Sequence, residues 1–244
     1  MIRALLIRGM LAGALAGLFA FAFARVFGEP QVNLAIAFEQ HLHAMAGEAP
    51  EPELVSRAVQ SSVGLLTGIF VYGCSLGGIF SLVFAYAYGR LASASPRGMA
   101  AILAVLGFVT LILMPQIKYP ANPPSIGEPS TIGVRTALYF TMIALSVIAA
   151  IAAISSGRQL AKRFGNWNSA ILASGAYLAV VAAAMVILPG VNEVPADFSA
   201  TTLWKFRLAS LGIEAVLWTA LGLIFGAAAE RQLVPRSLAA VRKS

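Results

Sequence analysis

The chain has 244 residues, of which 59% are hydrophobic and 11% are charged, and its mean hydropathy is +0.83. A soluble domain carries roughly a quarter charged residues, so the composition excludes an ordinary soluble protein and predicts folding in a membrane. The formal net charge of +7 does not indicate nucleic-acid binding, because the 17 Lys and Arg residues are split among short loops and form no stripe with aromatic side chains.

Six apolar stretches are each long enough to cross a bilayer as a helix, which takes about 20 residues. They are expected near residues 4–24, 60–88, 98–117, 136–157, 168–188 and 208–229, with outer loops at 25–59, 118–135 and 189–207. A closed barrel would show weak alternating segments, whereas Thr136 to Gly157 is one unbroken apolar run. The predicted fold class is all-α, a polytopic membrane helical bundle of six helices in a single transmembrane domain covering residues 1–244.

The distribution of basic residues predicts the orientation of the chain. With both termini in the cytoplasm of a bacterial cell, eleven Lys and Arg residues lie on the cytoplasmic side of the inner membrane and six on the outer side. Eight of the ten acidic residues and both histidines then lie outside. A cleaved signal peptide at residues 1–24 is the alternative to a retained first span, because Arg3 and Arg8 precede an apolar stretch that ends at Ala22-Phe23-Ala24.

Two of the outer loops resemble one another. Pro115 to Asn122 and Pro189 to Asp197 each contain a helix-ending proline and then Pro-Ala followed by Asn or Asp. This weak internal repeat predicts three helical hairpins, each formed by an outward span, an outer loop and a returning span. Glycines spaced four residues apart, as at Gly9, Gly13 and Gly17, predict close helix contacts, either within the bundle or with a partner's helix.

The first outer loop contains both histidines of the chain. His41 and His43 lie near Glu39 and Glu48, and imidazole with carboxylate suits divalent first-row metals. In a helix Glu39 and His43 share a face that His41 does not, so a transient capture site is favoured over a closed one. The alternative is an exposed amphipathic segment with two incidental histidines.

The proline-rich loops and one intramembrane carboxylate supply further candidates. Asn122 and Asp197 occupy matching repeat positions, and stiff loops there could form an outer mouth or merely end helices. Glu214 lies inside the last span, where a carboxylate is costly, so it could bind a permeating cation, carry a coupled proton or simply hydrogen-bond to a neighbour.

Three arginines each open a returning span, against the positive-inside bias: Arg57, Arg135 and Arg207. We expect them to form structural ion pairs with outer-loop carboxylates such as Glu53, Glu128 or Asp197. The alternative is a ring of cations that binds an anionic group.

Several catalytic signatures are absent from the sequence. No lysine completes a P-loop, no span contains a histidine for haem, and neither G-x-S-x-G nor H-E-x-x-H occurs. We therefore expect no enzyme and no permanently bound cofactor.

The strings Met114-Pro115-Gln116-Ile117-Lys118-Tyr119-Pro120-Ala121-Asn122-Pro123-Pro124 and Val194-Pro195-Ala196-Asp197-Phe198 resemble the signatures of the CbtA family of probable cobalt transporter subunits. The resemblance extends over nearly the whole chain. It implies uptake of Co²⁺ for cobalamin synthesis beside a small one-span, CbtB-like partner with a histidine-rich end, and Ni²⁺ would use the same ligands. It implies no particular binding residues. A non-transporting membrane scaffold or assembly subunit, or a membrane enzyme acting on a lipid or quinone, are the alternatives.

Overall fold

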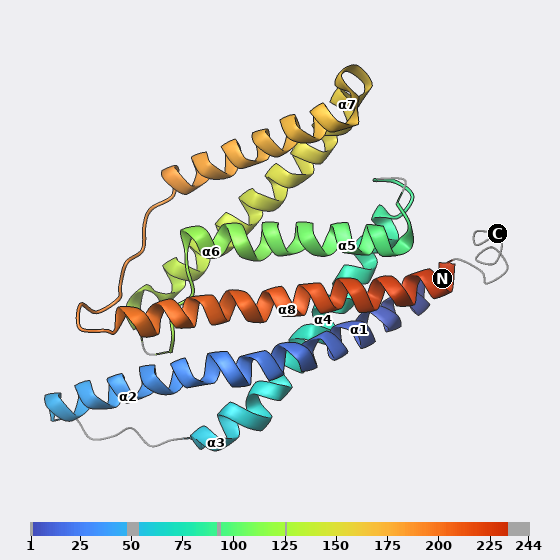
Figure 1. Ribbon diagram of the computed structural model, residues 1–244. Helices are drawn as coiled ribbons and strands as arrows, with labels where there is room; N and C mark the ends of the chain where they lie inside the picture. Colours follow the sequence, from blue (N-terminus) through green and yellow to red (C-terminus); the bar gives the residue numbers. More distant parts are fainter. Residues whose placement is uncertain (1, 48–53, 92–93, 125, 234–244) are drawn as a thin grey trace. The chain divides into compact units, whose positions relative to one another are not determined.

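The computed structural model describes residues 2–47, 54–91, 94–124 and 126–233, and within these ranges the chain is helical and has no strand (Figure 1). The helices in chain order are α1 (Ile2–Phe23), α2 (Glu29–Ala46), α3 (Arg57–Val59), α4 (Leu65–Ala87), α5 (Pro96–Gly107), α6 (Met114–Lys118), α7 (Ile132–Ile187) and α8 (Ala200–Leu233). Three π-helical segments, η1 (Ala24–Gly28), η2 (Gln60–Gly64) and η3 (Phe108–Leu113), and one 3-10 turn, η4 (Pro129–Thr131), complete the set.

Five helical stretches among the described residues are long and apolar enough to cross a membrane: Ile2–Ala46, Arg57–Ala87, Pro96–Lys118, Pro129–Ile187 and Ala200–Leu233. The predicted all-α membrane fold is thus confirmed. The fourth stretch contains two helical arms, because Gly165 has φ 76° and ψ 167° and interrupts α7 (Figure 1). The count of six spans and the hairpin repeat stay predictions.

Two prolines that were expected in a loop or at a helix end lie inside continuous helices. The first helix does not stop near residue 24 but continues through η1 into α2, and Pro30 is in the first turn of α2. Pro115, expected to end a helix, is the second residue of α6, which follows η3 directly and continues to Lys118. A proline ring clashes with the carbonyl four residues before it, and the wider π-helical turn accommodates the ring without ending the helix.

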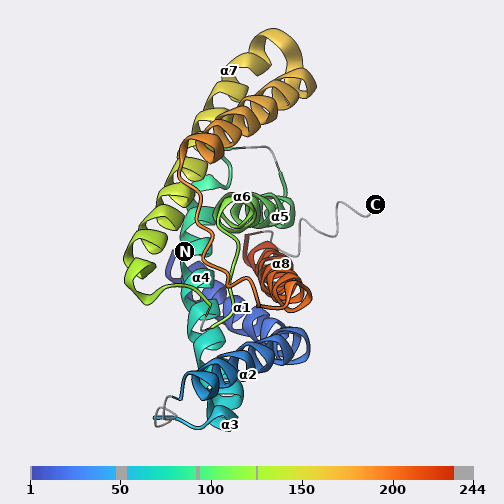
Figure 2. The ribbon, with the colours of Figure 1, turned by 90° about the vertical axis from the view of Figure 1, so that its left-hand side faces the viewer.

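The chain forms two compact units, of which unit 1 comprises residues 1–108 and 200–244. In unit 1, α1 crosses α4 at glycines and α8 packs against α1 and α5 (Figures 1 and 2). A methyl group on Gly13 would lie 1.9 Å from the backbone oxygen of Gly73, and one on Gly77 would lie 2.1 Å from that of Gly9. These glycines therefore serve packing within the chain.

Aromatic side chains fill the remainder of the unit 1 core. Phe225 of α8 makes edge contacts with Phe80 and Phe84 of α4, with ring centroids 5.5 Å and 5.0 Å apart. Leu217 and Leu221, on the same side of α8, are fully buried. Edge-to-face pairs of this kind add to the packing that holds α8 against α4.

Unit 2 comprises residues 109–199 and is built around α7. The two arms of α7 meet where the hydroxyl groups of Ser146 and Tyr177 lie 2.9 Å apart, and Met142 and Val181 form a small core between them. The hydroxyl of Tyr119 donates to the carbonyl of Pro189 at 2.9 Å. This bond joins the two segments that follow the predicted third and fifth spans, which are the segments of the internal repeat.

Candidate functional site

The buried carboxylate of Glu29 organises one end of unit 1. Glu29 is 7% exposed, and Arg57 at the start of α3 forms an ion pair with it. The Nε of Arg57 also donates to the side-chain oxygen of Asn33 at 3.0 Å. Because Glu29 and Asn33 are four residues apart on α2, they share a face, and one guanidinium group contacts both.

A second polar group of unit 1 surrounds Glu214 on α8. Its half-buried carboxyl group interacts with the side chains of Tyr72 on α4 and Trp218 one turn later on α8. The Oε2 of Glu214 and the indole Nε1 of Trp218 are buried, and neither has an aligned hydrogen-bond partner among the described residues. The carboxyl group is thus enclosed by aromatic side chains without being fully satisfied, which is costly in a membrane interior.

The segments that carry these two groups touch one another. A methyl group on Gly28 would lie 3.5 Å from Cδ1 of Ile213, so the end of η1 lies close to the middle of α8. Glu29 and Glu214 each follow one of the contacting residues directly. Glu29 and Glu214 therefore lie on adjacent elements of unit 1.

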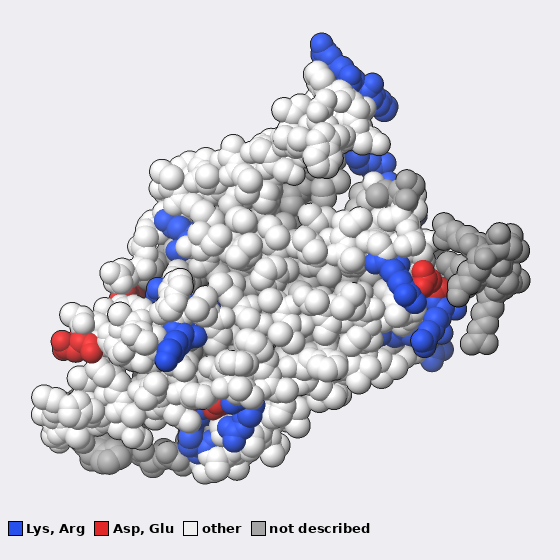
Figure 3. All heavy atoms as spheres, in the orientation of Figure 1, with Lys and Arg blue, Asp and Glu red and all other residues white. Residues whose placement is uncertain are grey.

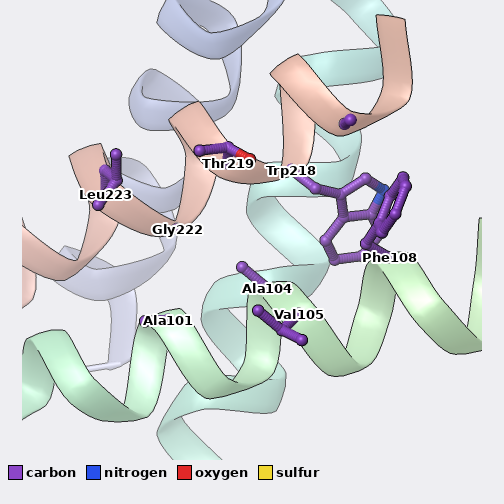
Figure 4. A pocket seen from close by; sticks show the side chains of 9 residues that line it. Ala101, Ala104, Val105, Phe108, Trp218, Thr219, Gly222 and Leu223 are labelled. Atoms are coloured by element: carbon purple, nitrogen blue, oxygen red, sulfur yellow. The ribbon is translucent and has the colours of Figure 1, made fainter. Parts of the chain in front are cut away.

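An open cavity of about 210 Å³ lies beside Trp218, between α5 and α8 (Figure 4). Figure 4 shows Trp218 and Phe108 together at one end of the cavity and Leu223 toward the other. Its lining is apolar apart from Thr219 and the Trp218 indole edge. An apolar cavity can hold a hydrocarbon chain but offers no ligands for a metal ion.

In unit 2 a carboxylate ties together the two proline-rich loops. Glu193 accepts hydrogen bonds from the hydroxyl of Thr131 at 2.6 Å and from the backbone N–H of Glu128 at 2.9 Å, and its Oε2 lies 3.3 Å from Nε of Arg135. The Thr131 hydrogen bond, then the Glu128 N–H and the Arg135 charge, hold the pKa of Glu193 below its ordinary value. Arg135 also donates to the carbonyl of Glu128 at 3.1 Å.

Gly127 permits this arrangement. Its φ of 121° is rarely adopted by other residues, and a methyl group there would lie 2.4 Å from the Arg135 guanidinium. We call Gly127, Glu128, Thr131, Arg135 and Glu193 the loop clasp. The clasp holds the two proline-rich loops together.

The histidine segment predicted as a metal-capture loop is helical. Glu39, His41 and His43 lie on α2, where Glu39 and His43 share a face that His41 does not, while Glu48 lies outside the described residues. Among the described residues no three His, Cys, Asp or Glu side chains lie close enough together to hold a metal ion. A capture site on α2 would therefore bind an ion through few protein ligands.

The remaining predicted residues lie on three elements. Asn122 lies in the loop after α6, Asp197 is exposed in the loop before α8, and Arg207 lies on α8 seven positions before Glu214. The structure brings Arg57 and Arg135 into ion pairs with Glu29 and Glu193, which the sequence argument had not named as their partners.

Sequence reasoning missed three groups that the structure places at these sites: Glu29, Asn33 and Tyr72. The i, i+4 spacing of Glu29 and Asn33 was visible, but the loop expected at residues 25–59 concealed it. Nothing local in the sequence marks Tyr72, because its relation to Glu214 depends on the packing of α4 with α8.

Charged side chains are sparse on the surface of the chain. Figure 3 shows a mostly white face with the blue and red atoms gathered in a few groups. Together with the five long apolar helices, this composition defines a helical membrane protein.

The chain belongs to the CbtA family, described as "Probable cobalt transporter subunit (CbtA)", whose model matches residues 2–230. The membership implies that the chain is a subunit of a membrane transporter for cobalt, and that it has partner subunits. Neither the curated proteins nor the solved structures contain a significant match to the chain.

Proposed function

We propose that the chain carries Co²⁺, and Ni²⁺ as a second substrate, inward across the bacterial inner membrane to supply cobalamin synthesis. The observation that carries the proposal is the family match over residues 2–230 of a chain built from long apolar helices. In this proposal the chain forms one membrane domain of six spans, with both termini in the cytoplasm, and it catalyses no reaction.

In this proposal the candidate ligands bind the ion one after another along its path across the membrane. Glu39, His41 and His43 on α2 capture the ion, and borderline imidazole and carboxylate donors suit Co²⁺ and Ni²⁺. Asn122 and Asp197 lie on the loops of the outer mouth, whose separation the loop clasp sets. Glu214 then offers a carboxylate within the membrane.

Few protein ligands at each step favour transport over storage. Conduction requires binding that is strong enough for entry and weak enough for release. A small one-span, CbtB-like subunit with a histidine-rich end supplies further imidazole ligands in this proposal. The word "subunit" in the family description supports such an assembly.

The test is cellular cobalt and nickel content, measured in cells with and without the chain, expressed alone and together with the small one-span subunit. We expect cobalt to rise with the chain and to rise further with the small subunit. Equal metal content in all cultures, with the chain present in the membrane, would exclude transport and favour a scaffold or assembly role.

A further inference from the structure

One guanidinium group in unit 1 binds two side-chain oxygens that lie on the same helix face. The Arg57 side chain forms an ion pair with the Glu29 carboxylate and donates its Nε–H to the Asn33 amide oxygen at 3.0 Å. Glu29 is almost completely buried, whereas Asn33 is exposed. The two oxygens therefore converge on a single positive charge at the edge of the protein interior.

A carboxylate oxygen and an amide oxygen are also ligands for divalent metal ions. We propose that Glu29 and Asn33 form a binding site for a hydrated divalent cation, and that the Arg57 guanidinium occupies this site when no metal is bound. The ion displaces Arg57 and keeps most of its water molecules, because only two protein ligands are available. The inference rests on the proposed function, since it places this site on the cobalt path.

Glu29 and Arg57 both lie close to π-helical turns. Glu29 follows the π-helical η1 directly, and Arg57 precedes the π-helical η2 by three residues. Single π-helical turns inside α-helices occur frequently at functional sites. Rewinding either turn as α-helix rotates the attached residue about the helix axis, which moves the guanidinium away from the carboxylate.

Two other arginines of unit 1 have partners of their own. Arg8 of α1 donates to the carbonyl of Ala228, and Arg97 of α5 pairs with Glu230. The Arg97–Glu230 pair is more exposed than the Glu29–Arg57 pair, with the Arg97 side chain 61% exposed. As an exposed Arg–Glu pair of the same unit, it serves as the control for the loss of an ion pair.

The first experiment distinguishes two roles of the Glu29–Arg57 pair: an ion pair that only stabilises the fold, and a cation site. The double variant Glu29→Gln/Arg57→Gln removes both charges, preserves side-chain size and leaves no buried charge unpaired. If the pair is purely structural, this variant should take up cobalt as well as the unmodified chain does. The proposal predicts normal abundance in the membrane and uptake reduced at least about tenfold, because a metal ligand has been removed.

The second experiment does not depend on the amount of folded protein. Arg57→Gln removes the intramolecular competitor, so the half-saturating cobalt concentration should fall, by roughly tenfold if the guanidinium occupies the site nine-tenths of the time. An unchanged or higher half-saturating concentration overturns the proposal. Arg97→Gln, the control, should leave it unchanged.

Titration of the purified full chain with cobalt chloride gives a readout that is independent of transport. Tighter binding by Arg57→Gln and one bound cobalt ion fewer in the double variant support the site, whereas equal binding by all three proteins overturns it. If the unmodified chain fails to raise cellular cobalt, the proposed function fails, and the titration still decides this inference. If the unmodified chain and the double variant transport equally well, only the inference fails.

Discussion

The Oε2 of Glu193 lies 3.3 Å from the Nε of Arg135, and the same carboxylate accepts hydrogen bonds from Thr131 and from the backbone of Glu128. Glu193 follows the second arm of α7, whereas the other three residues precede or open the first arm. One side chain therefore holds together two loops that are more than 60 residues apart in the sequence. The repeat that the sequence shows in these loops places neither Glu193 nor Arg135 in a shared contact.

The clasp should make the stability of the chain depend on acidic pH. The pKa of Glu193 is lowered from its ordinary value of 4.5, so the ionised carboxylate stabilises the fold above that pH. This contribution is lost as the pH falls through the lowered pKa. The unmodified chain should lose more thermal stability than Glu193→Gln between neutral pH and a pH below about 4, measured as the fraction of detergent-solubilised protein that remains monodisperse after heating. Asp197→Asn, a change in an exposed residue of the same loop, should behave like the unmodified chain.

Glycine contact between α1 and α4 should tolerate no side chain. In Gly13→Val the new side chain would meet the backbone of Gly73, which cannot move without separating the helices. Overpacking of this kind costs about 2 kcal/mol or more. We expect a lower unfolding temperature and less protein in the membrane. Gly68→Ala is the control, since no atom lies within 4 Å of the added methyl group, and it should be neutral or slightly stabilising. Equal stability of both variants would contradict the close crossing.

Removal of both histidines tests the capture step. The double variant His41→Ala/His43→Ala should reduce cobalt accumulation by about tenfold at low external cobalt and much less at saturating cobalt, because a capture site raises the local ion concentration. Accumulation is measured by elemental analysis of washed cells. Gln40→Ala, on the same helix, is the control. Unchanged accumulation in the histidine variant would remove α2 capture from the transport path.

Variants of Glu214 and Tyr72 test whether the ion path crosses unit 1. Glu214→Gln keeps the size of the side chain but removes its charge, so cobalt uptake should fall sharply while the amount of protein stays constant. Tyr72→Phe removes only the hydroxyl that faces this carboxyl group and should lower uptake less. Tyr86→Phe, in which an exposed phenol on the same helix is changed, is the control. A scaffold subunit would show full uptake in all three variants, provided that its transporting partner is present.

Competition with a hard cation tests the ligand chemistry of the path. A tenfold excess of Mg²⁺ over Co²⁺ should inhibit uptake weakly, because imidazole ligands favour first-row transition metals and Mg²⁺ retains its water. Ni²⁺ at the same excess should inhibit strongly. Uptake of labelled cobalt in the presence of each competitor gives the comparison, and strong inhibition by Mg²⁺ would show that the path consists of oxygen ligands alone.

The sequence by itself determined the class of fold. A chain that is 59% hydrophobic can satisfy its backbone in lipid only through helices or a closed barrel, and its unbroken apolar runs select helices. Composition and periodicity are local properties, so long apolar helices were predictable without knowledge of their neighbours. The close approach of α1 at Gly13 was predictable as well, although the identity of α4 as its neighbour was not.

Only the tertiary structure decided which polar groups meet. The pairing of Glu29 with Arg57, of Glu193 with Arg135 and of Glu214 with Tyr72 depends on how separate helices and loops pack. The same holds for Pro30, expected in a loop, and Pro115, expected to end a helix, both of which the structure accommodates beside π-helical turns. Side-chain contacts between distant segments arise from packing of the whole chain, and no local pattern encodes them.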